Sequence, residues 1–139
     1  MLLRIVSTGL IAVDFAVLVL SATNNRHAGD VAGTLGIRQV TNLLDNNIGI
    51  YGYPSDLIQN TLQIDQYGMR GRVTQEDTST AFYEIDTAPG QSGSALLNAN
   101  NQIVGVHSSG YSNNSGTPIL NGGPKMNSYM FTFVSSALQ

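Results

Sequence analysis

The most informative stretch of this sequence is Asp-Thr-Ala-Pro-Gly-Gln-Ser-Gly-Ser, residues 86–94. Glycines stand two residues before Ser92 and one residue after it, so the backbone can follow a tight path that projects the serine oxygen. A nucleophilic serine needs such a loop, because backbone N–H groups must point at the oxyanion that forms beside it. The pattern is not the Gly-x-Ser-x-Gly elbow of α/β-hydrolases, because Ser94 replaces the second glycine. Taken alone, Gly-x-Ser-Gly is more often an ordinary turn.

The segments on either side of this stretch are typical of short strands. Thr80–Ile85 is apolar and rich in β-formers, which predicts a strand that leads into residues 86–94. Ala95–Leu97 and Ile103–His107 predict a hairpin across the turn-forming residues 98–101, Asn-Ala-Asn-Asn. Ser108–Gly116 consists almost entirely of Ser, Gly and Asn, and we expect a second loop there.

Further strands are predicted upstream, and a helix is predicted at the end. Ile48–Tyr53 predicts a strand that Pro54 closes, and Leu57–Ile64 with Gly71–Gln75 predicts a hairpin. Asn127 is a suitable N-cap for a closing helix that runs through Leu138.

The first 22 residues are apolar and superficially resemble a signal peptide. Asp14, however, lies in the middle of the apolar run, where a carboxylate is costly to place in lipid. The run is rich in Val, Ile and Leu, so we predict two buried strands, Leu2–Val6 and Phe15–Leu20. No other segment approaches the roughly 20 apolar residues that span a bilayer, so no membrane partner is expected.

Composition indicates one compact β-rich domain. Of the 139 residues, 42% are hydrophobic, 11% are charged and 15 are glycines, which favours short strands joined by frequent turns. The net charge is −3 and the six basic residues are scattered, so nucleic acid is not an expected partner. Cysteine is absent, which excludes disulfides and thiolate metal sites.

In order and spacing, several motifs together resemble the V8-like glutamyl endopeptidases, which are chymotrypsin-like serine proteases of bacteria. The first is residues 86–94 with the hairpin that ends in Ile-Val-Gly-Val-His at 103–107. The others are Asp-Phe-Ala-Val-Leu at 14–18, Asn-Arg-His-Ala-Gly-Asp at 25–30 and Gly-Tyr-Pro at 52–54. The resemblance covers nearly the whole chain.

The resemblance implies an all-β fold, namely the C-terminal antiparallel β-barrel of the chymotrypsin-like fold, with six strands and a short C-terminal helix. It divides a single domain, 1–139, into residual strands of the N-terminal barrel (1–21), a connection (22–47) and the C-terminal barrel (48–139). It also implies a secreted enzyme that acts on peptides or proteins and needs no metal or organic cofactor.

The resemblance also assigns the catalytic roles. Ser92 is the expected nucleophile, and Asp14 is the carboxylate that orients the catalytic imidazole. The N–H groups of Gly90 and Ser92 are expected to form the oxyanion hole. Without the resemblance, Asp14 is more readily interpreted as an aspartate that opens a strand and caps a turn, and the resemblance reverses that preference.

Substrate binding is assigned in the same way. Thr87 and His107 match positions that line the primary specificity pocket, where a hydroxyl and an imidazole can hydrogen-bond the carboxylate of a substrate glutamate. Ser108, Ser109 and Gly110 would pair with the extended substrate backbone. The alternative for Thr87 is a simple turn residue, and for His107 a hydrogen-bonded histidine at a strand end.

The general base is missing from this pattern. The family has a histidine upstream of the aspartate, but no histidine precedes Asp14, and the two in the chain are His27 and His107. We therefore expect the chain alone to be a poor or inactive protease. Three explanations stay open: a truncated reading frame, a homologue that only binds acidic peptides, and completion by a missing N-terminal barrel or a second chain. A structural β-barrel module without catalytic ancestry is a further alternative.

Overall fold

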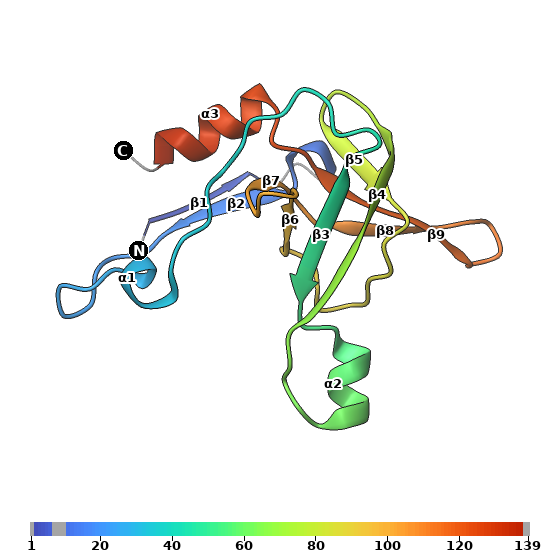
Figure 1. Ribbon diagram of the computed structural model, residues 1–139, viewed down its shortest axis with the longest axis horizontal. Coiled ribbons are helices and arrows are strands. Elements are labelled where there is room, and N and C mark those ends of the chain that lie inside the picture. The colour runs from blue at the N-terminus through green and yellow to red at the C-terminus, as the bar shows by residue number, and fades with distance from the viewer. Residues whose placement is uncertain (1, 7–10, 138–139) are drawn as a thin grey trace.

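The computed structural model describes residues 2–6 and 11–137, with side chains from residue 12 onward. Within these ranges, seven strands form one antiparallel sheet in the order β7-β6-β3-β4-β5-β9-β8, and β1 and β2 form a separate ribbon (Figure 1). The strands are β1 (Leu2–Val6), β2 (Phe15–Val19), β3 (Asn47–Gly52), β4 (Tyr67–Glu76), β5 (Thr80–Tyr83), β6 (Ala95–Leu97), β7 (Ile103–Val106), β8 (Ser109–Ser112) and β9 (Pro118–Pro124). The helices are η1 (Ile11–Val13), α1 (Ala28–Ala32), α2 (Ser55–Thr61) and α3 (Ser128–Ala137).

The seven-stranded sheet curls until strands far apart in its order meet. Gly105 of β7 forms an antiparallel bridge with Lys125, just after β9. The N–H of Met126 donates to the carbonyl of Val104 over 2.7 Å. The sheet therefore closes on itself, and the predicted antiparallel β-barrel with a short C-terminal helix is confirmed.

The barrel interior is filled by apolar side chains at alternate strand positions. Ile48 and Ile50 of β3 point inward, as do Ala81 and Tyr83 of β5, and all four are at most 1% exposed. Burying a side chain the size of isoleucine contributes about 1.5–3 kcal/mol. The core cluster comprises Leu43, Ile48, Ile50, Val73, Ala81, Tyr83, Ile85, Leu96 and Val104.

A second apolar cluster attaches β2 to the C-terminal helix. Phe15 is 6% exposed and packs edge-on against Phe133 of α3, with ring centroids 5.5 Å apart. Asn127 caps this helix as predicted, because its Oδ1 accepts the N–H of Met130 over 3.0 Å. Leu138, the predicted last helical residue, lies outside the described residues. Leu18 of β2 and Leu20, just after the strand, are by contrast 58% and 56% exposed, so apolar side chains face solvent there.

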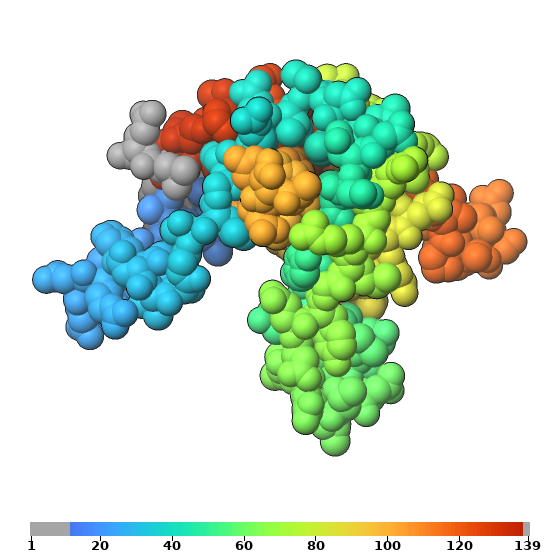
Figure 2. Space-filling model, viewed as in Figure 1, coloured from blue at the N-terminus to red at the C-terminus, as the bar shows by residue number. Residues whose placement is uncertain are grey.

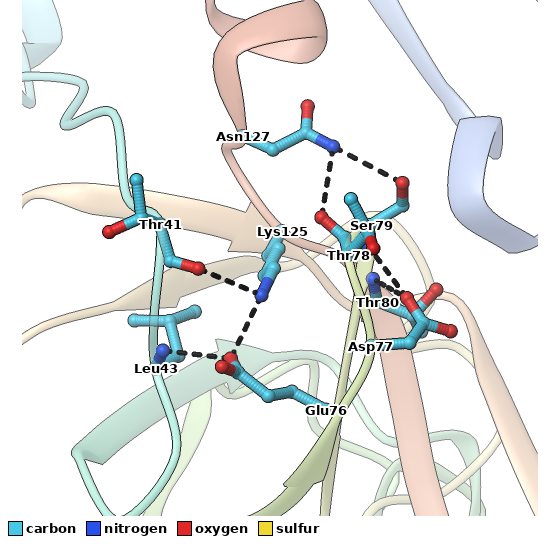
Figure 3. A network of polar contacts seen from close by, with 9 residues as sticks. All are labelled: Thr41, Leu43, Glu76, Asp77, Thr78, Ser79, Thr80, Lys125 and Asn127. Carbon is cyan, nitrogen blue, oxygen red and sulfur yellow. Dashed lines mark hydrogen bonds and ion pairs between the residues drawn. The ribbon is translucent and has the colours of Figure 1, made fainter.

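A buried ion pair fixes the connection between β2 and β3 to the barrel (Figure 3). Lys125 Nζ lies 3.0 Å from Glu76 Oε2 and also donates to the carbonyl of Thr41 over 3.2 Å. The same carboxylate oxygen accepts the N–H of Leu43 over 2.8 Å. Each charge thus has a partner, and the pair joins strand β4, the end of β9 and the incoming connection.

One predicted strand is wrong. Residues 57–64 were expected to form the first half of a hairpin, but Ser55–Thr61 forms helix α2. The helix follows Pro54 and ends where Leu62 adopts left-handed backbone with φ 58°. None of its residues is buried, and the segment projects from the barrel as the green lobe in Figure 2. The apolar residues of this segment therefore do not belong to a buried strand, as the sequence pattern had suggested.

The predicted loop Ser108–Gly116 is also partly wrong, because Ser109–Ser112 forms β8 and pairs with β9. The barrel consequently has seven strands in the described residues instead of six. No helix within the described residues is long and apolar enough to cross a bilayer.

Candidate active site

The loop between β5 and β6 holds Ser92 between two glycines with left-handed backbone. Gly90 has φ +100° and Gly93 has φ +88°, a region that other residues enter only with strain. The N–H of Gln91 donates to Ala88 O over 3.2 Å, and the Gln91 side chain accepts the Ala88 N–H over 2.8 Å. These contacts fold the loop into a tight turn, and the Ser92 side chain lies exposed at its surface.

The Gly-Tyr-Pro segment at 52–54 packs directly against this loop. A Cβ built on Gly90 would lie only 2.6 Å from the carbonyl oxygen of Tyr53, so the backbones approach too closely for any side chain. A Cβ on Gly52 would meet Ser94 Oγ at 2.5 Å. The N–H of Ser55 donates to Pro89 O over 2.8 Å. The motif that carried part of the resemblance thus supports the shape of the Ser92 loop.

Ser108 connects Ser92 with Asp14. Its carbonyl accepts a 3.2 Å hydrogen bond from Ser92 Oγ, and its own hydroxyl donates to Asp14 Oδ2 over 2.5 Å. The fold therefore brings the predicted nucleophile and the predicted carboxylate to one corner of the barrel. This contact of Ser108 with the carboxylate was not foreseen in the sequence, where Ser108 was expected only to pair with substrate.

The predicted oxyanion donors have no partner among the residues that the structure describes. Within the described part of the chain, the N–H groups of Gly90 and Ser92 donate no hydrogen bond. The next amide, that of Gly93, donates to His107 O over 2.8 Å and is therefore occupied. Two free donors beside an exposed serine oxygen can bind a developing negative charge.

His107 is buried beside the same loop. Its side chain is 4% exposed, and Nδ1 lies 2.8 Å from the hydroxyl of Tyr83, which is fully buried. Its N–H donates to Ser94 O over 2.8 Å. Burial lowers the pKa of the His107 imidazole below its ordinary 6.5, because the charged form loses hydration. Tyr83 escaped sequence analysis, since nothing in a strand-forming Tyr marks a partner 24 positions away.

Thr87 and His107 were predicted to share one pocket. Thr87 lines a cavity between the Ser92 loop, α2 and the start of β4, whose wall includes Asp56, Tyr67 and Gln91. His107 is not among the residues that line this cavity. The predicted pairing of Thr87 and His107 in one pocket is thus not visible in this cavity.

Ser109 and Gly110 belong to β8, the last strand in the order of the sheet. β8 pairs with β9 and leaves its other edge without a neighbouring strand in the described residues. An open edge of this kind can accept an extended peptide as an added strand.

The second histidine of the chain lies elsewhere. His27 immediately precedes α1, which lies to one side of the barrel in Figure 1, and its N–H donates to Asp30 over 2.8 Å. Within the described residues no group of three His, Cys, Asp or Glu side chains is placed to hold a metal ion.

The curled antiparallel barrel with its short C-terminal helix is the architecture of the chymotrypsin-like proteases. Comparison with known proteins agrees: the family model "Trypsin" matches residues 16–126, and the chain belongs to this family. That match begins two residues after Asp14.

The relatives place the chain among V8-like proteases. Glutamyl endopeptidase of Staphylococcus epidermidis is 31% identical over 102 residues, which is 72% of this chain and 35% of that protein. A solved Glu endopeptidase in complex with MPD is 43% identical with a TM-score of 0.86, covering 99% of this chain and 62% of the other. The thermostable serine protease AL20, at 21% identity and a TM-score of 0.75, shares the fold. The chain thus spans about a third of the length of the curated relative.

Proposed function

We propose that this chain carries the nucleophile and the substrate-binding face of a serine endopeptidase. The observation that supports this most directly is the exposed Ser92 between left-handed Gly90 and Gly93, with two backbone N–H groups that donate no hydrogen bond among the described residues. Ser92 Oγ attacks the carbonyl carbon of the scissile bond, and the N–H groups of Gly90 and Ser92 bind the oxyanion. An imidazole takes the serine proton and passes it to the leaving amine, and water then hydrolyses the acyl-enzyme.

We further propose cleavage after glutamate. His107 supports this assignment, because a buried neutral imidazole next to the Ser92 loop offers an N–H donor to a carboxylate. Thr87, in the Ser92 loop, supplies a hydroxyl as the second donor. The relatives named glutamyl endopeptidase support the same preference. Substrate backbone binds along β8, at Ser108, Ser109 and Gly110. By analogy with the V8-like family, we propose that the enzyme is secreted.

We propose that the imidazole that takes the proton is supplied by a histidine other than His27 and His107 as they are placed here. Within the described residues, Ser92 Oγ donates to Ser108 O and Asp14 accepts from Ser108 Oγ, and no hydrogen bond joins either residue to an imidazole. His107 is held by Tyr83. We therefore expect the 139-residue chain to have little activity alone and to need a histidine-bearing segment or second chain.

The test is hydrolysis of a fluorogenic peptide with glutamate before the scissile bond, with Ser92→Ala as the matched control. No turnover above the control is the expected result for the chain alone. Turnover that appears on adding the upstream barrel of a relative, and that Ser92→Ala abolishes, supports the protease assignment. If the completed assembly cleaves equally well after glutamine and glutamate, the proposed specificity is wrong.

A second function, peptide binding without cleavage, is favoured by the partner of Ser92 Oγ, which among the described residues is the carbonyl of Ser108 and not an imidazole. In that case the chain binds peptides that end in glutamate, and no histidine-bearing partner restores hydrolysis. Failure to bind such peptides, together with failure of complementation, would reject both functions.

A further inference from the structure

The pair formed by Tyr83 and His107 crosses the interior of the barrel. Tyr83 is on β5 and His107 directly follows β7, and these strands are not neighbours in the sheet. Their side chains are 0% and 4% exposed, and the Tyr83 oxygen lies 2.8 Å from His107 Nδ1. A buried tyrosine hydroxyl and a buried imidazole thus satisfy each other in the core below the Ser92 loop.

The direction of this hydrogen bond follows from the number of donors and acceptors. Among the described residues, His107 Nδ1 is the partner of the Tyr83 hydroxyl. If Nδ1 carried the proton, the phenolic hydrogen would be buried without an acceptor, which is strongly unfavourable. Burial raises the pKa of Tyr83, so the hydroxyl keeps its proton and can donate it. Nδ1 is therefore the acceptor, and in the neutral imidazole Nε2 carries the hydrogen.

The His107 backbone and its ring atom Nδ1 are hydrogen-bonded, but Nε2 is left available. The backbone of His107 bonds to Gly93 N–H and to Ser94 O, each over 2.8 Å, so the residue cannot shift without the loop. Nε2 has no hydrogen-bond partner among the described residues. Among the described residues, the buried side-chain polar atom without a hydrogen-bond partner is Thr80 Oγ1. Nε2 of His107 also lacks a partner but is not such a buried atom, so it is not sealed from solvent.

We propose that Tyr83 is a positioning residue that holds neutral His107 in the Nε2–H tautomer, so that the imidazole presents a donor to the acidic side chain of the substrate. The inference rests on the proposed function, in which His107 binds that side chain. Tyr83 does not touch the substrate; it acts by occupying Nδ1. A fixed donor needs no proton rearrangement when a carboxylate arrives, and a hydrogen bond to a carboxylate is charge-assisted.

The tautomer can be read by NMR of the chain with ¹⁵N-labelled histidine at about pH 8, where an ordinary histidine is neutral. The chain has two histidines, so a His27→Gln variant assigns both sets of signals. We expect a protonated Nε2 and an unprotonated Nδ1 for His107. Tyr83→Phe removes one oxygen and should shift His107 toward a mixture of tautomers. Tyr129→Phe on α3, where the tyrosine is 54% exposed, should leave the spectrum unchanged.

Two results would overturn the inference: an Nδ1–H tautomer in the unaltered chain, or an unchanged His107 spectrum in folded Tyr83→Phe. The first needs no variant, so the inference stays testable even if Tyr83→Phe fails to fold.

Titration with a peptide that ends in glutamate separates this inference from the proposed function. We expect the His107 Nε2 signal to move in the unaltered chain, and Tyr83→Phe to bind about tenfold more weakly, as loss of one well-placed hydrogen bond predicts. If the tautomer is as inferred but no peptide moves the Nε2 signal, the glutamate specificity fails and the substrate part of this inference fails with it. Equal binding by Tyr83→Phe would show that Tyr83 does not act on recognition.

Discussion

Ser108 donates its hydroxyl to Asp14 across 94 positions of sequence, and its carbonyl accepts the hydroxyl of Ser92. One residue thus sets the relative position of the ribbon that bears the aspartate and the loop that bears the serine. Packing of Phe15 on α3 supports the same arrangement, because Phe15 directly follows Asp14. The C-terminal helix therefore contributes to the site without entering it.

The Asp14–Ser108 hydrogen bond should appear as a coupling energy in a double-mutant cycle. We expect Asp14→Ala and Ser108→Ala each to lower the free energy of unfolding by about 1 kcal/mol, because the acceptor is charged but exposed. The double variant should lose less than the sum of the two. Urea unfolding measures all four proteins, with Ser112→Ala on the exposed part of β8 as a control. Strictly additive losses would contradict the contact.

Gly90 and Gly93 offer a matched test of how the Ser92 loop is built. Both have positive φ, so alanine should cost about 1 kcal/mol of backbone strain at either position. Only at Gly90 does the new Cβ also collide with backbone, at 2.6 Å from Tyr53 O, while nothing lies within 4 Å at Gly93. Gly90→Ala should therefore unfold at clearly lower urea concentration than Gly93→Ala. Equal urea midpoints for the two variants would show that the backbone at Tyr53 can move away from a side chain at position 90.

The parts of the site that sequence could predict are those encoded locally. The turn around Ser92 and the hairpin that ends at His107 are contiguous, and their glycine, asparagine and β-branched residues specify them directly. Family resemblance was needed to single out Asp14, because its partner Ser108 is distant in sequence.

The parts that sequence missed depend on tertiary contacts. Leu57 and Ile58 look like strand residues, but Pro54 starts a helix there, and Ser55 N–H is tied to Pro89 O of the Ser92 loop. β8 has the composition of a loop and becomes a strand because β9 pairs with it. Tyr83 was likewise read only as a strand residue, and its hydrogen bond to His107 forms when the barrel closes.

The buried Lys125–Glu76 pair should be far more sensitive to loss of one partner than the surface pair Arg72–Asp45. Glu76→Ala leaves a 2%-exposed ammonium without its counter-charge, and we expect a loss of about 3–5 kcal/mol. Replacing both residues, as in Lys125→Met with Glu76→Leu, should cost less than Glu76→Ala alone. Asp45→Ala removes a pair whose side chains are 64% and 74% exposed and should cost well under 1 kcal/mol, at most about 0.5. Similar losses in Glu76→Ala and Asp45→Ala, compared by urea unfolding, would mean that the buried pair does not hold the connection.

Burial of His107 predicts how stability depends on pH. The folded state lowers the pKa of this imidazole, so the unfolded chain, with a value near 6.5, binds the proton more readily. Stability from this group is therefore complete above pH 6.5 and is lost as pH falls from 6.5 through the folded pKa. His107→Gln keeps an acceptor for Tyr83 but cannot be protonated, so its unfolding free energy should fall less between about pH 7.5 and pH 5.5. His27 and the carboxyl groups are present in both proteins, so their contributions cancel in the comparison. NMR titration of His107 gives the pKa directly, and a value at or above 6.5, or equal pH slopes in the two proteins, would show that the imidazole is not held neutral by burial.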